Sequence, residues 1–182
     1  MDEQLLCIKY ARKSAIRKLK TTEIVGIVCT TVLTSCGAKT NANFLNISWD
    51  ASPTDALATI TSALERNSVN YSPPHSIGSK ELSITLFSDP FYDLKDCMLF
   101  ISILSENNKT KKIELSYIGM IDGDFDHIVQ KISKEVGAPN KTEEETEIIG
   151  TTTETAFWTL ENTEINVFRS GVIGSIEFTP KS

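Results

Sequence analysis

Two amphipathic helix patterns, 72 residues apart, constrain the fold of this chain more than any other feature. Each pattern places three apolar residues on one helix face. In residues 52–66 and 124–136 these are Leu57, Ile60 and Leu64, and Val129, Ile132 and Val136. One helix on a few strands buries little apolar surface, whereas two such units side by side share one core. The spacing therefore predicts an internal repeat.

Both helices carry start and stop signals. The expected residues are Ser52, Pro53 and Asp55 at the start of the first helix with Asn67 at its end, and Asp122 or Asp124 at the start of the second with Gly137 at its end. A Ser or Asp side chain can accept a hydrogen bond from the first free backbone N–H groups, and Gly commonly follows a helix. These signals support helices of the stated lengths.

Apolar runs that alternate with polar residues predict strands in the rest of the body. The expected strands cover residues 82–86, 98–104 and 113–117 between the helices, and 147–149, 156–160, 164–168 and 172–178 after the second helix. Turn residues at 106–109, 161–162 and 170–171 join neighbouring strands. The predicted fold is α+β, with two helix-plus-antiparallel-strand repeats (44–120 and 121–182) that share a core and follow a signal peptide.

The first 35 residues and the rest of the chain carry opposite net charges. Residues 1–35 hold six Lys or Arg against three Asp or Glu, whereas the rest of the chain holds twelve against twenty-one. A basic leader before an acidic body is typical of a targeting segment. The acidic body is a poor match for nucleic acid, because phosphate binding needs clustered Lys and Arg. We expect no nucleic-acid partner.

The leader has the order of a secretory signal, since the basic segment 9–20 precedes the apolar run 24–33. This run is shorter than the roughly 20 residues that span a bilayer. It ends at Leu33-Thr34-Ser35-Cys36, which resembles the lipobox of bacterial lipoproteins. The resemblance implies cleavage before Cys36 and a lipid on that residue. Alternatives are an ordinary signal peptide or a stray apolar segment in a cytoplasmic protein.

The lipoprotein interpretation fixes the expected location. Residues 1–35 form the signal peptide, 36–43 a lipidated polar tether, and 44–182 the folded domain. The protein is then held on the extracytoplasmic side of the cell membrane or outer membrane by the lipid on Cys36. Cys97 is the one cysteine left in the body, so no disulfide within it is expected, and we expect Cys97 to be buried.

The body also bears a family resemblance. A helix followed by "VGAP", an acidic segment, "FWTL" and "GVIGSIEF" is similar to repeats in β-lactamase-inhibitor-protein-like proteins and small outer-membrane assembly lipoproteins. In those families each unit packs one or two helices on a small antiparallel sheet. The resemblance implies protein binding, inhibition or assembly, and it implies no catalysis.

Two acidic clusters could hold cations. The first is Asp122-Gly123-Asp124-Phe125-Asp126, but an EF-hand loop needs a Glu at its twelfth position and Ser133 stands there. We interpret this cluster as a helix start. The second is the run from Glu143 to Glu147, which we interpret as solvated loop or strand edge, with a cation site or a patch for a basic partner as the alternative. We therefore expect no metal.

Catalytic signatures are scarce. The sequence has no G-x-S-x-G elbow, phosphate-binding loop or dinucleotide-binding glycine motif. His127 is expected on a solvated helix face. We therefore predict no enzyme activity and no cofactor, and keep an envelope enzyme or a purely structural lipoprotein as alternatives.

The expected activity is the non-catalytic binding of an envelope or extracellular protein, or of another envelope component, by a monomer. Its binding surface would be an exposed sheet face or a rigid loop. The residues singled out for this surface are Tyr71, Pro73, Pro74, His75 and Trp158, although a Trp in a strand is more often part of a core.

Overall fold

A computed structural model describes residues 44–78, 80–146 and 151–182. All of these residues belong to one compact unit. The expected signal peptide, Cys36, the tether and the strand at 147–149 lie outside the described residues. The elements are η1 (Phe44–Asn46), α2 (Pro53–Arg66), β1 (His75–Ile77), β2 (Glu81–Leu86), β3 (Met98–Glu106), β4 (Lys109–Ile118), α3 (Asp124–Val136), β5 (Lys141–Thr146), β6 (Thr152–Thr159), β7 (Thr163–Ser170) and β8 (Ile173–Pro180).

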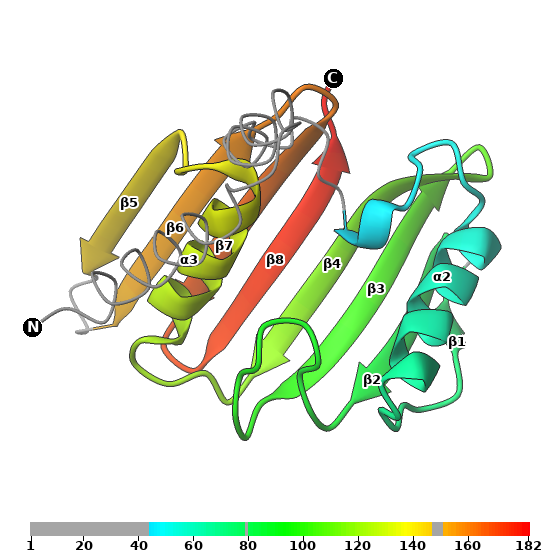
Figure 1. Cartoon of the computed structure of the whole chain (residues 1–182), viewed down its shortest axis with the longest axis horizontal. Coiled ribbons are helices and arrows are strands. Elements are labelled where there is room, and N and C mark those ends of the chain that lie inside the picture. Colours follow the sequence, from blue (N-terminus) through cyan, green and yellow to red (C-terminus); the bar gives the residue numbers. More distant parts are fainter. Residues whose placement is uncertain (1–43, 79, 147–150) are drawn as a thin grey trace, which may run out of the picture. The chain divides into compact units, whose positions relative to one another are not determined.

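The eight strands among the described residues form a single antiparallel sheet in the order β1-β2-β3-β4-β8-β7-β6-β5. Each half of the chain therefore contributes one helix and four consecutive strands, and the two halves meet where β4 pairs with β8 (Figure 1). The α+β class is confirmed, with a larger sheet than expected. The sequence predicted three strands before α3, and the short β1 is the fourth.

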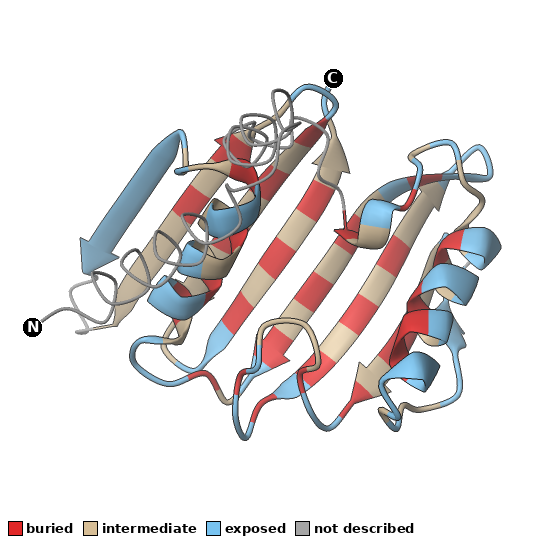
Figure 2. Ribbon diagram, in the orientation of Figure 1, coloured by how far each residue is buried: buried red, intermediate tan, exposed pale blue. Residues whose placement is uncertain are grey.

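The core lies between the sheet and the two helices, which cover the same face (Figure 1). Side chains on this helix face of the sheet are buried, and those on the other face are mostly half-buried (Figure 2). On the helices, Ile60 and Leu64 of α2 match the buried Ile132 and Val136 of α3, as predicted. Leu57 and Val129 are only half-buried beside them.

The start of α2 is the one predicted from the sequence. The Ser52 side chain accepts a hydrogen bond from the backbone N–H of Asp55, Pro53 is the first helical residue and Asn67 ends the helix. The start of α3 differs. Its cap is Gly123, in the left-handed conformation with φ of 91°, and no side chain caps it. Asp122 instead pairs with Arg169, 47 residues away, at 2.7 Å.

Contacts across the chain fix the segment before α2. The backbone N–H and hydroxyl of Thr110 both donate to the Ala51 carbonyl, at 2.9 and 3.0 Å. The Trp49 indole donates to the Thr163 hydroxyl at 3.1 Å, and Thr163 begins β7 in the other half. The segment around Trp49 therefore joins the two halves of the sheet at one end.

Candidate functional site

The open face of the sheet, opposite the helices, is the broadest candidate surface. No helix or strand among the described residues covers it. Its centre is polar, because Glu114 lies directly opposite Glu177 on neighbouring strands. The Lys112 ammonium bridges the two carboxylates, at 2.6 and 3.1 Å. Burial alone would raise the pKa of Glu114, but hydrogen bonds from Lys112 and Ser116 outweigh it and lower that pKa. One ammonium thus faces two carboxylates, and one net negative charge remains at the centre.

An apolar cluster occupies one end of the sheet, and we name it the apolar end patch. It contains six of the seven large hydrophobic residues that are exposed among the described residues, between 38% and 73% accessible: Phe87, Met98, Ile118, Ile121, Val172 and Ile173. They come from the ends or connections of β2, β3, β4 and β8, all of which meet at the same end of the sheet. Figure 2 shows the starts of β3 and β8 as exposed.

Strand register explains why the patch is continuous. Met98 lies directly opposite Ile118, and Ile118 lies directly opposite Ile173, so three neighbouring strands present one apolar row. The backbone N–H groups of Gly119 and Met120 both donate to the Val172 carbonyl, at 2.9 and 3.0 Å. These bonds hold the connection after β4 against the β7–β8 turn.

Two half-buried aromatic residues extend this surface onto the open face. Phe100 of β3 and Phe168 of β7 occupy the next row, on either side of Ser116 and Ser175. Apolar side chains therefore continue from the patch toward the polar centre of the face.

The structure brings four of the five residues predicted for a binding surface together and places the fifth, Trp158, elsewhere. Pro73, Pro74 and His75 are exposed at the β1 edge of the sheet. Tyr71 is half-buried there, and its hydroxyl donates to Glu65 at 3.0 Å, which raises the pKa of Tyr71. Trp158 lies in the other half of the sheet, 1% exposed, and its indole donates to the Gly137 carbonyl at 2.9 Å. Trp158 is a core residue in this fold, as its strand position favoured, and offers no binding surface.

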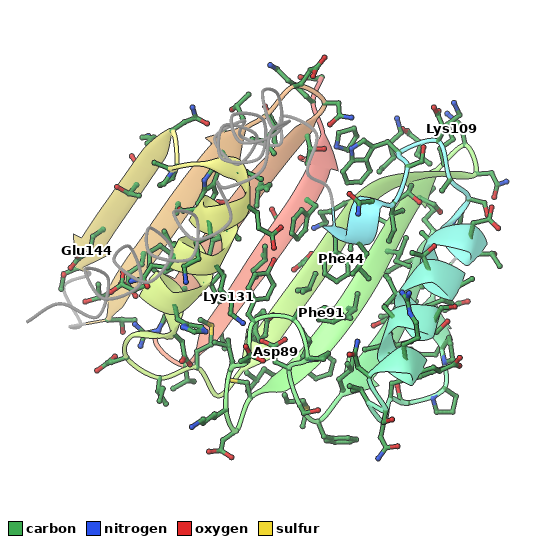
Figure 3. All side chains as sticks on the ribbon, in the orientation of Figure 1. Phe44, Asp89, Phe91, Lys109, Lys131 and Glu144 are labelled. Carbon is green, nitrogen blue, oxygen red and sulfur yellow. The ribbon has the colours of Figure 1, made fainter. Side chains whose placement is uncertain are left out.

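A cleft of about 470 Å³ opens on the helix face of the sheet. It is mostly apolar and is lined by Phe44, Leu45, Pro90, Phe91, Tyr92, Lys131, Ile132, Lys134, Glu135, Val136, Ile165 and Phe178. Phe44 forms one wall, with its ring edge-on to Phe91 at 4.9 Å between centroids and 5.5 Å from Phe178. In Figure 3 the labelled Phe44 and Phe91 lie between the two helices.

The loop from β2 to β3 is held by Asp89, which is 6% exposed. Its carboxylate accepts hydrogen bonds from the backbone N–H groups of Phe91, Tyr92 and Leu94, at 2.9, 3.2 and 3.4 Å. The Tyr117 hydroxyl lies beside this carboxylate without a hydrogen bond of ordinary geometry. Burial raises the pKa of Asp89 despite the opposing effect of the three backbone bonds. Asp89 therefore positions the cleft wall.

The acidic clusters gather no metal ligands. Asp122 pairs with Arg169, and the Asp124 carboxylate accepts from the backbone N–H of Ile121 at 2.8 Å. Glu143, Glu144 and Glu145 lie on β5, the edge strand, where every residue is exposed. Within the described ranges, no group of three or more His, Cys, Asp or Glu side chains is placed to hold a metal ion.

The structure also places the two remaining nucleophile candidates, Cys97 and His127. Cys97 is buried as expected, and burial raises the pKa of its thiol. His127 is exposed, as predicted, but its Nε2 lies 2.9 Å from the Tyr92 carbonyl. Neither side chain is arranged for nucleophilic chemistry.

The comparisons with known proteins give no family for this chain: no family model, curated sequence or solved structure matches it. Among the described helices, none has the length and apolar character that a membrane span requires. The apolar end patch was not predicted from the sequence. A signal was present, since Ile121 and Val172 are apolar residues beside glycine-containing turns, where polar residues are expected.

Proposed function

We propose that this protein is a non-catalytic binding module that holds a partner protein through its apolar end patch. The observation that carries the proposal is the gathering of six exposed apolar side chains at one end of the sheet. Large exposed apolar surfaces are uncommon on soluble proteins and usually mark interaction sites. The strand register makes this surface continuous, which suits a partner that presents a complementary apolar surface.

The electrostatics of the open face also favour a protein partner. The ammonium of Lys112 offsets one of the two carboxylate charges of Glu114 and Glu177, so the net charge at its centre is only one negative charge. Phe100 and Phe168 add apolar contact area beside the patch. Interfaces commonly combine an apolar centre that contains aromatic residues with a polar rim. The open face offers this arrangement around the apolar end patch.

We further propose that the module is a bacterial lipoprotein attached to the outside of a membrane by a lipid on Cys36. The support is the sequence alone, because the lipobox-like Leu33-Thr34-Ser35-Cys36 follows a basic segment and an apolar run. Anchoring would leave the domain free to meet partners in the envelope.

The two halves, 44–120 and 121–182, are proposed to be repeats of one unit. Their support is the shared order of one helix and four strands, together with the 72-residue offset between Ile60 and Ile132 and between Leu64 and Val136. The patch lies where these two units meet.

The test compares matched substitutions at three isoleucines with the same exposure, 50%. Ile118→Glu and Ile173→Glu introduce a charge within the patch, and Ile77→Glu introduces one in β1, outside it. Each variant would be crosslinked in cells, and the crosslinked species identified by mass spectrometry. We expect the wild type and Ile77→Glu to retain the same partner and both patch variants to lose it.

Thermal unfolding of the purified variants provides the control for folding. Exposed positions tolerate substitution with little change in stability. Equal crosslinking by all four proteins, with their folds intact, would show that the patch does not bind the partner.

A further inference from the structure

The two halves of the core differ in how closely they are packed, and the cleft on the helix face lies in the less closely packed half. Under α2, Ala56, Ile60 and Leu64 are 0% exposed, so that half is closed. Under α3, Ile132 and Val136 are 5% and 7% exposed, because the cleft reaches them. Protein cores are normally packed without voids much larger than a water molecule. The opening beside α3 is therefore space that a ligand can fill.

The floor and walls of the cleft suit a hydrocarbon chain. Phe178 and Ile165 form the floor, and Phe44 and Phe91 stand at one side. The volume of about 470 Å³ lies within the range of small-molecule sites, roughly 300–1,000 Å³. Burial of an alkyl chain against these side chains removes apolar surface from water on both partners.

The backbone at the wall is unusual. Leu45 and the next residue, Asn46, have φ values of 53° and 57°. This left-handed region is unfavourable for a bulky residue such as Leu and requires support from its surroundings. Contacts of Phe44 with Phe91 and Phe178 supply part of that support. The wall is thus held in a defined position beside the cleft.

The polar residues of the cleft favour an anionic headgroup. Two of the three charged side chains that line it are cations, Lys131 and Lys134, in a body that is acidic overall. Lys131 pairs with Asp93. Lys134 is exposed, and no carboxylate among residues 44–78, 80–146 and 151–182 pairs with it. Tyr92 adds a hydroxyl that makes no hydrogen bond within the described part of the chain.

We propose that this cleft binds a long-chain carboxylic acid, with its hydrocarbon chain on the floor formed by Phe178 and Ile165 and its carboxylate near Lys134. This site is separate from the apolar end patch and does not depend on the proposed partner protein. Glu135, the single acidic residue of the lining, lies near Tyr92. The Lys134 ammonium, which pairs with no carboxylate in the described part of the chain, therefore distinguishes an acid from a neutral alcohol of the same length.

The test uses residues 38–182, which contain every described core residue. Dodecanoate and 1-dodecanol would be titrated into this protein by calorimetry, below the concentrations at which either aggregates. We expect saturable binding of one dodecanoate per protein and weaker binding of the alcohol. Lys134→Ala should weaken dodecanoate binding about two- to five-fold, the value of one exposed ion pair. It should leave the alcohol unchanged, and Lys181→Ala should change neither.

Two matched substitutions locate the ligand. Val136→Phe adds volume inside the cleft and should abolish binding of both probes, whereas Val172→Phe adds the same volume in the apolar end patch and should have no effect. If Val136→Phe is shown by circular dichroism to be unfolded, Leu45→Trp at the half-exposed wall replaces it. Absence of saturable binding by the wild type would overturn the proposal, as would loss of binding in Val172→Phe only. If dodecanoate binds residues 38–182 but does not bind the lipidated full-length protein, the cleft holds the lipid on Cys36 instead. That result would also overturn the proposal.

Discussion

Removal of the Asp89 carboxylate is the perturbation whose effect follows most directly from the structure. In Asp89→Ala, the backbone N–H groups of Phe91, Tyr92 and Leu94 lose their acceptor. A buried donor left without a partner costs about 1–3 kcal/mol. Because the loop can relax and admit water to some of the three groups, we expect a loss of about 2–4 kcal/mol in the free energy of unfolding.

The assay is urea unfolding followed by circular dichroism and tryptophan fluorescence. Asp93→Asn is the matched control, because Asp93 lies in the same loop with its carboxylate exposed. Asn also tolerates the φ of 59° at this position. We expect little change in that variant. A loss below about 0.5 kcal/mol in Asp89→Ala, the range of ordinary surface substitutions, would refute the assigned role of the carboxylate.

The pH dependence of Asp89→Asn gives a second check. Burial raises the pKa of Asp89 in the folded protein above its unfolded value of 3.8. The folded state therefore binds this proton more tightly, and the wild type loses stability as pH rises from 3.8 through the raised pKa. Asn does not titrate, so the stability difference between the wild type and Asp89→Asn should be larger near pH 3 than at pH 7. The opposite trend would contradict the raised pKa.

Two further predictions concern the core and the anchor. Leu64→Ala removes a fully buried side chain and should cost about 2–5 kcal/mol in urea unfolding. Val136→Ala removes a smaller buried side chain and should cost somewhat less. A substitution that changes nothing would argue against a core shared by the two halves. Cys36→Ala should abolish metabolic labelling with a radioactive fatty acid and leave an uncut precursor, and unchanged labelling would contradict the lipoprotein proposal.

The helices and central strands could be predicted because their signals are local. The apolar spacing of α2 and α3 and the alternation in β4 reflect one buried face, which sequence periodicity records directly. Asn107 and Asn108 in the β3–β4 turn have φ values of 53° and 58°, the left-handed conformation that a two-residue hairpin loop favours and Asn tolerates. In these elements the local preference and the final fold agree.

Other features depend on residues far apart in the chain. The strand β5 has no buried side chain and is held by pairing with β6, so its Glu-rich sequence carries no alternation. The sequence predicted Asp122 as a possible helix cap, but its carboxylate pairs with Arg169 of β7. The apolar end patch likewise requires the strand order that places Ile173 beside Ile118. No local pattern predicts these juxtapositions.

The last prediction concerns the junction between the halves. Phe178 of the second half packs against Phe44 of the first, and residues 113–118 of β4 pair with residues 173–178 of β8. Separating residues 44–120 from 121–182 would expose a few hundred Å² of apolar surface, which at roughly 25 cal/mol per Å² amounts to several kcal/mol. This is comparable to the total stability of a small domain, about 5–15 kcal/mol.

We therefore expect neither half to show a cooperative unfolding transition by circular dichroism when expressed alone. The cleft and the apolar end patch both draw residues from the two halves, so each site should be lost with the junction. A half that unfolds cooperatively on its own would show that its core is independent of the other half. That result would refute the claim that the cleft and the apolar end patch depend on a shared core.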